Sequence, residues 1–224
     1  RGEVEFLRTI RATPEHTWGL LLALARKLPA AAAASLTAPW DRDAYRGTEL
    51  AGKRLGIFGL GRVGSIVASY AAAFHMPVFA YDTAPVSAPG VTMVGSLAEL
   101  LTQSDVLLVH VPLDASTHHA IGAAELSRLP RGALVVNTAR GAIIEEDALV
   151  EALEAGHLAG AAVDVLEGER AHGGRPDSAL LRFASAHPDR AIVTPHIAGA
   201  TWESMHRTEI FLAQRLRRLV SAGT

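Results

Sequence analysis

The sequence predicts an α/β fold built on a doubly wound parallel sheet. Short apolar runs alternate with segments of helical periodicity, as expected when helices connect parallel strands that are buried on both faces. Glycine-rich or polar segments directly follow several of these runs, at the strand ends where such sheets bind ligands. The strands are predicted at residues 54–58, 78–81, 105–111, 133–137, 159–163 and 190–193, and the helices between the first five at 61–74, 96–102, 123–128 and 145–155.

An earlier helix is predicted to begin with Thr13 as its N-cap and Pro14 at its first helical position, and to stop at Pro29. Its apolar surface is broader than one stripe, because Leu20 and Leu24 lie outside the main one. Such a helix is either wedged inside its own domain or part of a subunit interface, and we predict the interface. A final helical pattern occupies residues 205–224, and residues 167–190 are predicted as a long loop with one helical turn.

The most informative segment is RLGIFGLGRVGSIVASYAAAFHMPVFAYD, residues 54–82. Gly59 permits a tight strand-to-helix turn, Gly61 lets the backbone approach a pyrophosphate, and Gly64 lets the helix pack closely on the strand. The start of the helix attracts phosphates through its free N–H groups and its dipole. Asp82 ends the next apolar run, where a carboxylate accepts hydrogen bonds from an adenosine ribose and repels a 2′-phosphate. This segment predicts a dinucleotide site that prefers NAD.

Composition excludes several classes of protein. The 224 residues are 49% hydrophobic and 20% charged, and a net charge of −2 argues against nucleic acid or an anionic membrane as the main partner. No apolar run has the length of a membrane helix and no signal peptide is visible, so a cytoplasmic protein is expected. The absence of cysteine excludes disulfides and thiolate chemistry. Because the chain begins with Arg1, we interpret it as a fragment, a processed product or a trimmed chain.

Three segments that follow predicted strands contain side chains suited to catalysis. VVNTARG places Arg140 at a strand end, where a guanidinium could bind a carboxylate and polarise the adjacent carbonyl. TPHIAGAT places His196 at the same edge, and AAVDVLEGER adds three carboxylates: Asp164, Glu167 and Glu169. Histidine exchanges protons near neutral pH, and a neighbouring carboxylate orients its ring. Each residue alone is more often structural, but together around a nucleotide site they indicate hydride transfer with acid–base assistance.

The ten histidines do not predict a metal site. His118 and His119 are adjacent, so in an extended segment their side chains point apart, and neither a cysteine nor clustered acids complete a shell. His110 lies in a predicted buried strand and is interpreted as a hydrogen-bonded core residue. His196 is the only histidine to which we assign a role.

The order of several longer motifs resembles one family. They extend from about Thr13 to Ser204 and are ATPEHTWGLLLALAR, GTELAGKRLGIFGLGRVG, SDVLLVHVPLDAST, VVNTARGAIIEEDALVEAL, LAGAAVDVLEGE and TPHIAGAT. The sequence resembles the D-isomer-specific 2-hydroxyacid dehydrogenases, and most closely their D-3-phosphoglycerate dehydrogenase branch. The resemblance implies a Rossmann-type NAD-binding domain that dimerises. It also implies that Arg140 binds the substrate, that His196 is the acid–base group, and that Glu169, not Glu167, pairs with this histidine.

Together with the glycine-rich segment, the resemblance implies cofactor contacts at the carboxyl ends of several strands. They are Gly59, Gly61, Arg62, Val63, Gly64, Asp82, Val111, Pro112, Thr138, Ala139, Asp164, Ala198 and Gly199.

The chain departs from the family pattern in its domain content and in one loop. Members usually carry a further region before this point, which forms most of a second, substrate-binding domain. We therefore predict that residues 1–12 are a remnant or linker, 13–204 the dinucleotide-binding domain with the catalytic groups, and 205–224 a helix leading towards the substrate domain. Arg170 stands where the family commonly has proline. The loop from Arg170 to Pro195 is nearer in length to that of the phosphite and formate dehydrogenase relatives.

The leading hypothesis is an NAD-dependent oxidoreductase acting between a D-2-hydroxy acid and its 2-oxo acid, with 3-phosphoglycerate as one candidate. Two alternatives stay open. One is a nucleotide-sensing interaction protein like the C-terminal binding protein corepressors, which keep the same catalytic residues, and the other is a sibling phosphite or formate dehydrogenase. A homodimer through the cofactor domain is expected.

Overall fold

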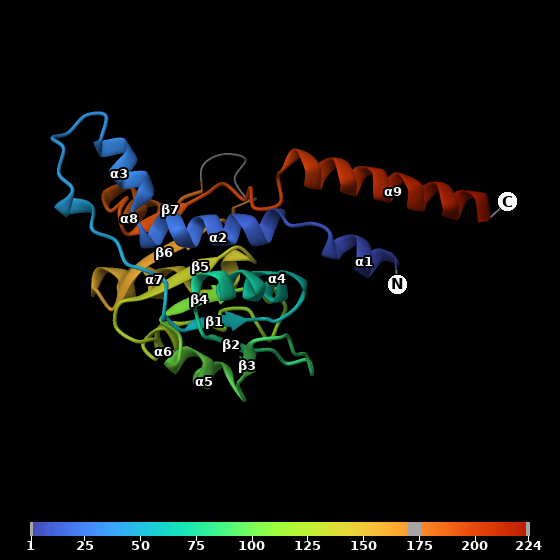
Figure 1. Ribbon diagram of the computed structural model, residues 1–224, viewed down its shortest axis with the longest axis horizontal. Helices are drawn as coiled ribbons and strands as arrows, with labels where there is room; N and C mark the ends of the chain where they lie inside the picture. The colour runs from blue at the N-terminus through green and yellow to red at the C-terminus, as the bar shows by residue number, and fades with distance from the viewer. Residues whose placement is uncertain (1, 170–175, 223–224) are drawn as a thin grey trace.

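A seven-stranded parallel sheet forms the centre of the computed structural model, which describes residues 2–169 and 176–222 (Figure 1). The strands are β1 (Leu55–Phe58), β2 (Val78–Tyr81), β3 (Val91–Met93), β4 (Val106–Val109), β5 (Ala133–Asn137), β6 (Leu158–Val163) and β7 (Ala191–Val193). Their order is β3-β2-β1-β4-β5-β6-β7, and each neighbouring pair is parallel. Successive strands are added towards one edge from β1 to β3 and towards the other edge from β4 to β7, so the switch point at which doubly wound sheets bind ligands lies between β1 and β4. The predicted fold class is confirmed.

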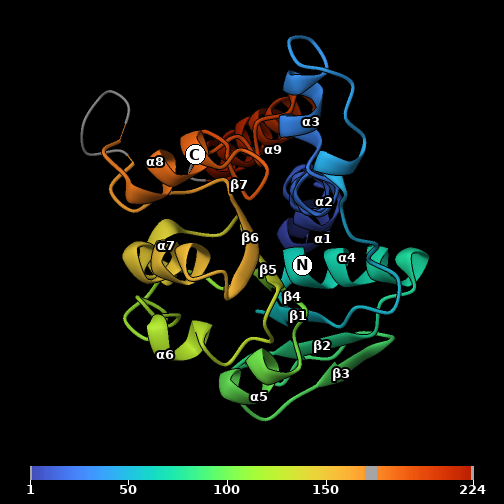
Figure 2. The same cartoon turned by 90° about the vertical axis from the view of Figure 1, so that its left-hand side faces the viewer.

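Helices cover both faces of the sheet (Figure 2). One face carries α2 (Ala12–Ala25) and α4 (Arg62–Ala71), and the other carries α5 (Leu97–Thr102), α6 (Ala123–Leu126), α7 (Glu146–Glu154) and α8 (Ala179–Ala186). In β4, Val106 and Leu108 belong to the apolar cluster that contains α2 and α4, whereas Leu107 and Val109 belong to the opposite cluster. Burial on both faces explains why these strands read as continuous apolar runs. Short 3₁₀ turns lie at Asp43–Tyr45, Ala72–Phe74 and Gly141–Ile143.

The amino-terminal helix differs from its prediction at both ends. α2 begins at Ala12 with Arg11 as its N-cap, so the assignment of Thr13 as the cap is wrong. The helix ends at Ala25, and the chain turns at Lys27, which has a φ of +53°. A second helix, α3 (Leu28–Ala34), follows and has a proline in its first turn. Pro29 therefore lies at the start of a new helix and does not end the previous one. Proline is tolerated there because the first turn of a helix does not use the backbone N–H that proline lacks.

The prediction also differs from the structure at β3 and α8. β3 is a three-residue edge strand, too short for its residues to form a recognisable apolar run. α8 occupies part of the segment predicted as a long loop and has eight residues, which is two turns. Its N-cap Ser178 accepts a hydrogen bond from the Leu181 N–H at 3.1 Å, and Leu180 and Phe183 are buried. The remaining part of that predicted loop includes residues 170–175, which lie outside the described residues.

The apolar surplus of α2 is buried inside this domain. Leu20 and Leu24 are 5% and 4% exposed and pack in one cluster with α4 and the sheet. A Cβ at Gly160 of β6 would lie 2.9 Å from Leu24 Cδ1, so this helix rests directly on the strand. The structure therefore agrees with the other interpretation of this sequence, in which the helix is wedged inside its own domain. The homodimer stays a prediction, and the composition of α2 no longer supports it.

Two helices extend together beyond the sheet (Figure 1). Phe6 of α1 (Gly2–Arg8) stacks on Phe211 of α9 (Trp202–Ala222), with ring centroids 4.1 Å apart and planes within 4°. The predicted remnant or linker therefore contains a helix. α9 leaves several large apolar side chains exposed: Met205, Ile210, Leu212, Leu216, Leu219 and Val220. Within residues 2–169 and 176–222, no helix combines the length and hydropathy of a membrane span.

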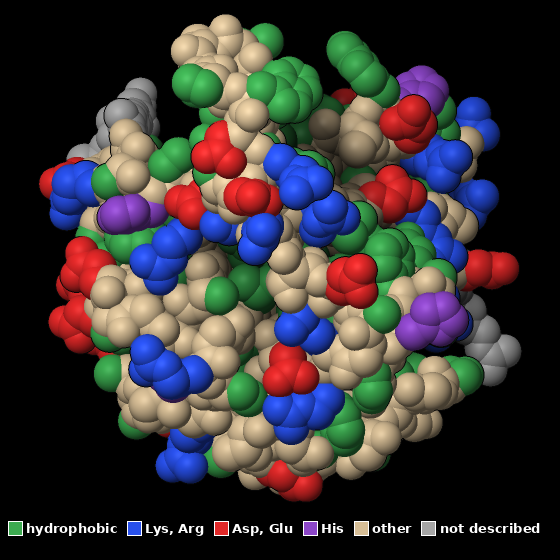
Figure 3. Space-filling model, turned by 60° about the vertical axis from the view of Figure 1, so that its left-hand side comes forward, with side chains coloured by type: hydrophobic (Ala, Val, Ile, Leu, Met, Phe, Trp, Pro, Cys, Tyr) green, Lys and Arg blue, Asp and Glu red, His purple; other side chains and the backbone are tan. Residues whose placement is uncertain are grey.

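Charges of both signs are interspersed on the face shown in Figure 3, where Lys and Arg side chains lie among Asp and Glu side chains. Interspersed charges produce a weaker summed field than a patch of one sign.

Candidate active site

The loop between β1 and α4 has the glycine geometry that a close backbone approach requires. Gly59 has a φ of +97°, and a Cβ there would lie 2.8 Å from the carbonyl carbon of His110. A Cβ at Gly64 would lie 2.1 Å from the Gly59 carbonyl oxygen, so α4 packs directly on the turn. Gly61 is the N-cap of α4, and no described atom lies within 4 Å of where its Cβ would be. Gly61 therefore leaves open space before the helix, where a phosphate can bind.

A cleft of about 540 Å³ opens beside this loop, within the range of roughly 300–1,000 Å³ typical of small-molecule sites. It is lined by Leu7, Arg8, Leu60, Gly61, Arg62, Ser65, Val86 and Ser87. Asp82 lies next to it, because its carboxylate accepts hydrogen bonds from the Leu60 N–H at 2.8 Å and the Ala84 N–H at 2.9 Å. Asp82 thus joins the loop after β2 to the glycine-rich loop.

The Arg62 side chain closes one wall of the cleft. Its Nη1 donates to the carbonyl oxygens of Ile10 at 3.2 Å and Leu7 at 3.3 Å, and burial lowers the pKa of this guanidinium. Its backbone N–H lies in the first turn of α4, where it has no intrahelical partner. A phosphate contact would therefore involve this N–H. Val63 is half-buried and packs in the cluster that contains α2.

The loop after β5 is shaped by Asn137, which the sequence analysis did not single out. Its Oδ1 accepts from the Ala139 N–H at 3.0 Å, and its Nδ2 donates to the Arg140 carbonyl at 2.9 Å. Asn137 is 1% exposed. A polar residue at the end of an apolar run, three positions before Arg140, is the sequence feature that could have identified it. The Thr138 hydroxyl is 2.7 Å from that of Thr17 in α2, so it faces the helix.

Arg140 is exposed, and its Nη1 donates to the Ala139 carbonyl at 2.6 Å. The next residue, Gly141, has no room for a side chain because a Cβ would lie 2.1 Å from the carbonyl carbon of Leu166. The loop that carries Arg140 is therefore in close contact with the loop after β6.

The structure pairs His196 with Glu169. The ring Nδ1 is hydrogen-bonded to Glu169 Oε1, and Glu169 Oε2 accepts from the Leu166 N–H at 3.0 Å. His196 has a φ of +55°, a left-handed conformation that is strained for a residue with a side chain. Its Nε2 makes no hydrogen bond with a described residue, and the side chain is 34% exposed. This nitrogen is therefore the one available to a substrate. Gly199, three residues later in the chain, is exposed, and no described atom lies within 4 Å of where its Cβ would be.

Asp164 holds the loop between β7 and α9. It is fully buried, and its Oδ1 accepts from the Ile197 N–H at 2.9 Å and from the Thr194 hydroxyl. Its Oδ2 accepts from the Ala198 N–H at 2.7 Å. His16 of α2 adds a contact, since its Nε2 lies 3.4 Å from Asp164 Oδ1. His16 belongs to the helix that was predicted to form a subunit interface, and no role was assigned to it from the sequence.

The loop after β4 lies against the glycine-rich loop. The His110 N–H donates to the Phe58 carbonyl at 2.7 Å, and Val111 packs on the apolar layer. The Pro112 carbonyl accepts from the Thr117 hydroxyl at 2.7 Å. The expectation that His110 is a hydrogen-bonded core residue is wrong, because its buried Nε2 has no partner among the described residues.

Acid should destabilise the protein through His110. Burial lowers its pKa to about 4, from 6.5 in an unfolded chain. As the pH falls from 6.5 to 4, the unfolded chain takes up the proton first, so the free energy of unfolding decreases by about 3 kcal/mol. Below pH 4 both states are protonated and this contribution stays constant. Chemical denaturation of His110→Asn between these pH values should show a smaller loss than the unchanged chain, and the exposed-site variant His206→Asn should show the same loss as the unchanged chain. An equal loss in His110→Asn would contradict this assignment.

The expectation that His118 and His119 point apart is also wrong. Both lie in a turn, their ring centroids are 4.0 Å apart, and both contact the carboxylate of Glu167. Adjacent side chains point apart only in an extended segment, whereas His119 has a φ of +50°.

Comparisons with known proteins agree with this geometry. The family model for the D-isomer specific 2-hydroxyacid dehydrogenase NAD binding domain matches residues 18–198. Over 210 residues the chain is 37% identical to D-3-phosphoglycerate dehydrogenase of Methanocaldococcus jannaschii, covering 92% of this chain and 38% of that protein. Over 202 residues it is 36% identical to hydroxypyruvate reductase of Thermotoga maritima, covering 90% and 64%.

A solved structure also matches over nearly the whole chain. It is D-lactate dehydrogenase from Aquifex aeolicus, complexed with NAD and lactic acid, with a TM-score of 0.86 and 32% identity. The match covers 96% of this chain and 68% of that one. The chain thus spans 38% and 64% of the two curated relatives described above. From the match over residues 18–198, this chain belongs to the D-isomer-specific 2-hydroxyacid dehydrogenase family and contains its NAD-binding domain.

Proposed function

We propose that this chain binds NAD and supplies the acid–base group for hydride transfer between a D-2-hydroxy acid and its 2-oxo acid. One observation carries the proposal: a histidine paired with a carboxylate lies at the same sheet edge as an open glycine-rich loop. The pair is His196 and Glu169, and loops at the carboxyl ends of parallel strands converge on one ligand.

The residues present fit a dinucleotide. The open space before Gly61 and the amino end of α4 suit a pyrophosphate, and the cleft of about 540 Å³ adjoins them. Asp82 accepts two backbone hydrogen bonds and keeps lone pairs free for the hydroxyls of a ribose. When bound, NAD provides the hydride acceptor for oxidation and, in its reduced form, the hydride donor.

The proton moves at His196. In oxidation Nε2 accepts the substrate hydroxyl proton, and in reduction it returns a proton to the carbonyl oxygen. Glu169 holds the ring through Nδ1, which keeps Nε2 directed at the substrate. Arg140, exposed at the end of β5, binds the substrate carboxylate through its guanidinium fork. Asp164 fixes the loop that presents the histidine.

The substrate class follows from two of these groups. Arg140 is a cation for the substrate carboxylate, and His196 is a base for the substrate hydroxyl. Relatives are named as D-3-phosphoglycerate dehydrogenase, hydroxypyruvate reductase and glyoxylate reductase, and we propose a small 2-oxo acid of this kind for this chain. We also propose that a substrate domain outside residues 1–224 encloses it, with α9 leading there, and that the active protein is a cytoplasmic homodimer. The 224-residue chain alone should then bind NAD but turn over slowly, because positioning and water exclusion need the second domain.

NAD should bind more tightly than NADP, because the Asp82 carboxylate accepts hydrogen bonds from a ribose diol and repels a 2′-phosphate. Calorimetric titration of the chain with both cofactors measures this preference. Asp82→Ala should weaken NAD binding and reduce the preference, and Asp82→Asn should remove the repulsion while keeping most of the shape. Glu203→Ala, an exposed change on α9, is the matched control and should alter neither affinity. Tighter binding of NADP to the unchanged chain would refute the assignment of Asp82.

A further inference from the structure

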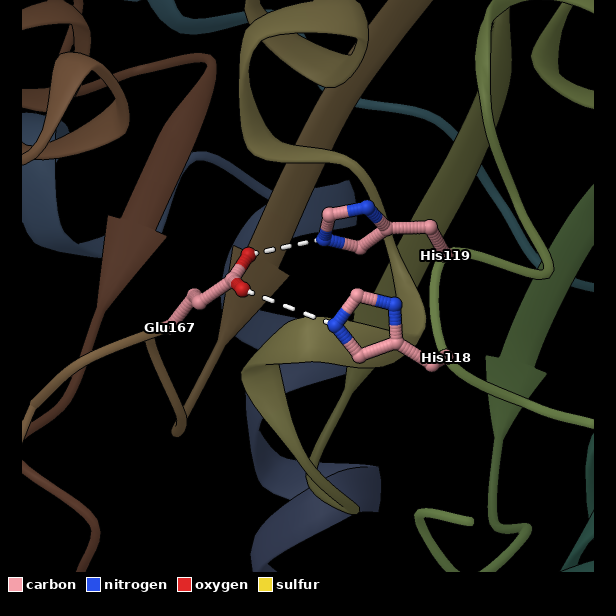
Figure 4. A group of neighbouring side chains, drawn as sticks. All are labelled: His118, His119 and Glu167. Carbon is pink, nitrogen blue, oxygen red and sulfur yellow. Dashed lines mark hydrogen bonds and ion pairs between the residues drawn. The ribbon is translucent and has the colours of Figure 1, made fainter. Parts of the chain in front are cut away.

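Three side chains with metal-binding groups converge at the carboxyl edge of the sheet, apart from the His196–Glu169 pair. His119 Nε2 lies 2.9 Å from Glu167 Oε2, and His118 Nε2 lies 3.8 Å from Glu167 Oε1. The three ligand atoms lie within 4.8 Å of one another. Figure 4 shows the two imidazoles one above the other, with the forked carboxylate facing both.

The backbone of the loop between β4 and α6 produces this convergence. His119 has a φ of +50°, a left-handed conformation that is strained for a residue with a side chain. Its N–H donates to the Ala142 carbonyl at 2.8 Å, which holds the turn against the loop after β5. Adjacent side chains therefore lie on one side of the chain, with ring centroids 4.0 Å apart.

The third ligand, Glu167, comes from the loop after β6, which packs closely on the loop after β5. Glu167 follows β6, and a Cβ at Gly141 would lie 2.3 Å from the Glu167 backbone nitrogen. The loops after β5 and β6 are therefore in direct contact, and His119 is hydrogen-bonded to the first of them. The cluster joins the loop after β4 to the loop after β6, across the loop after β5.

The donor types favour a particular class of metal ion. Two imidazole nitrogens and a carboxylate oxygen form a ligand set that binds Zn²⁺ in sites with one open position. Ca²⁺ and Mg²⁺ prefer oxygen ligands throughout. With bonds of about 2.0–2.1 Å in a tetrahedral arrangement, neighbouring ligand atoms lie about 3.3 Å apart. The 2.9 Å between His119 Nε2 and Glu167 Oε2 is close to this value, and the ligand atoms of all three residues lie within 4.8 Å of one another. Side chains that are 38–52% exposed can rotate to reach the tetrahedral spacing.

We propose that His118, His119 and Glu167 bind one divalent transition-metal ion of the Zn²⁺ class, with water in the fourth position. The ion replaces the direct contacts between the carboxylate and the imidazoles, and it links two loops at the sheet edge. Glu167 lies two residues before Glu169, so the ion also restrains the loop that carries the partner of His196.

Calorimetric titration of the metal-free 224-residue chain with Zn²⁺ should reveal one tight site. Co²⁺ serves as a spectroscopic probe, and we expect the visible absorption of a four-coordinate ion. Glu167→Gln and His119→Asn should each weaken Zn²⁺ binding at least about tenfold, since even loss of groups that only orient ligands costs 10–100-fold. Asparagine tolerates the left-handed conformation, so His119→Asn keeps the turn.

Matched controls come from α9, where His206→Asn and Glu203→Gln remove an exposed histidine and an exposed glutamate. Both should leave Zn²⁺ affinity and the Co²⁺ spectrum unchanged. Thermal unfolding of each metal-free variant shows whether its fold is intact. Absence of Zn²⁺ binding, or equal Zn²⁺ affinity in the unchanged chain and folded Glu167→Gln, would overturn the proposal.

Discussion

His196→Ala should lower turnover at least about 100-fold in both directions, within the range of 10²–10⁴ typical of general acid–base catalysis. The Nε2 of this histidine has no partner among the described residues, and its Nδ1 is held by Glu169, so one nitrogen is left for the substrate proton. The measurement is steady-state turnover of the longer protein that we propose to contain this chain, with a 2-oxo acid and NADH and then with the corresponding hydroxy acid and NAD.

The same variant should keep its affinity for NAD, because the imidazole acts on the substrate and not on the phosphates or the ribose. His206→Ala on α9 is the control and should retain full turnover. Glu169→Gln keeps the shape of the partner but removes its charge, so we expect a smaller loss than for His196→Ala. Unaltered turnover in His196→Ala would eliminate the proposed proton transfer, whereas loss of NAD affinity would indicate a disturbed fold.

Two glycines at the start of α4, Gly61 and Gly64, should respond to alanine in different ways. Gly64→Ala places a Cβ 2.1 Å from the Gly59 carbonyl oxygen, a clash with a backbone atom that no side-chain rotation relieves. Overpacking of this kind destabilises a fold by about 1–3 kcal/mol or more. Gly61→Ala meets no described atom within 4 Å and should fold normally. Its methyl group enters the space proposed for the pyrophosphate, so NAD binding should weaken more than about tenfold, equal to about 1.4 kcal/mol.

Thermal unfolding and NAD calorimetry on both variants separate these two effects. Gly19→Ala is the control, because it adds a methyl group to an equally open position in α2, far in sequence from the loop. It should leave NAD binding unchanged and should slightly stabilise the helix. Normal NAD binding by Gly61→Ala would mean that the phosphates lie elsewhere.

The sheet could be predicted because its strands are buried on both faces. Leu107 and Leu108 point to opposite apolar layers, so consecutive apolar residues are required in β4, and the sequence shows them. The edge strand β3 has half-buried or exposed residues, so its sequence does not need a continuous apolar run and does not show one. The length of α8 was underestimated as one turn, since only Leu180 and Phe183 of its eight residues are buried, too few for a clear helical period.

The candidate site was predictable where a motif identifies residues of known chemistry. Arg140, Glu169 and His196 came from their motifs, and the structure joins the last two. Contacts formed by distant segments left no local signal. His16 reaches Asp164 from a helix 148 positions earlier, and the His118–His119 turn depends on a left-handed residue that the sequence pattern does not reveal. The sequence likewise did not show that α2 is buried within the domain, because its burial depends on packing against α4 and the sheet.

The central claim is hydride transfer between NADH and a 2-oxo acid with His196 as the acid. The most direct test incubates the longer protein with NADH and a panel of 2-oxo acids that includes glyoxylate, hydroxypyruvate, pyruvate and 3-phosphohydroxypyruvate, with phosphite and formate tested with NAD. We predict that NADH is consumed with at least one 2-oxo acid, that chiral 2-hydroxy acid products have the D configuration, and that His196→Ala abolishes most of this consumption. Turnover with phosphite or formate alone, or no turnover with any member of the panel, would contradict the proposed function.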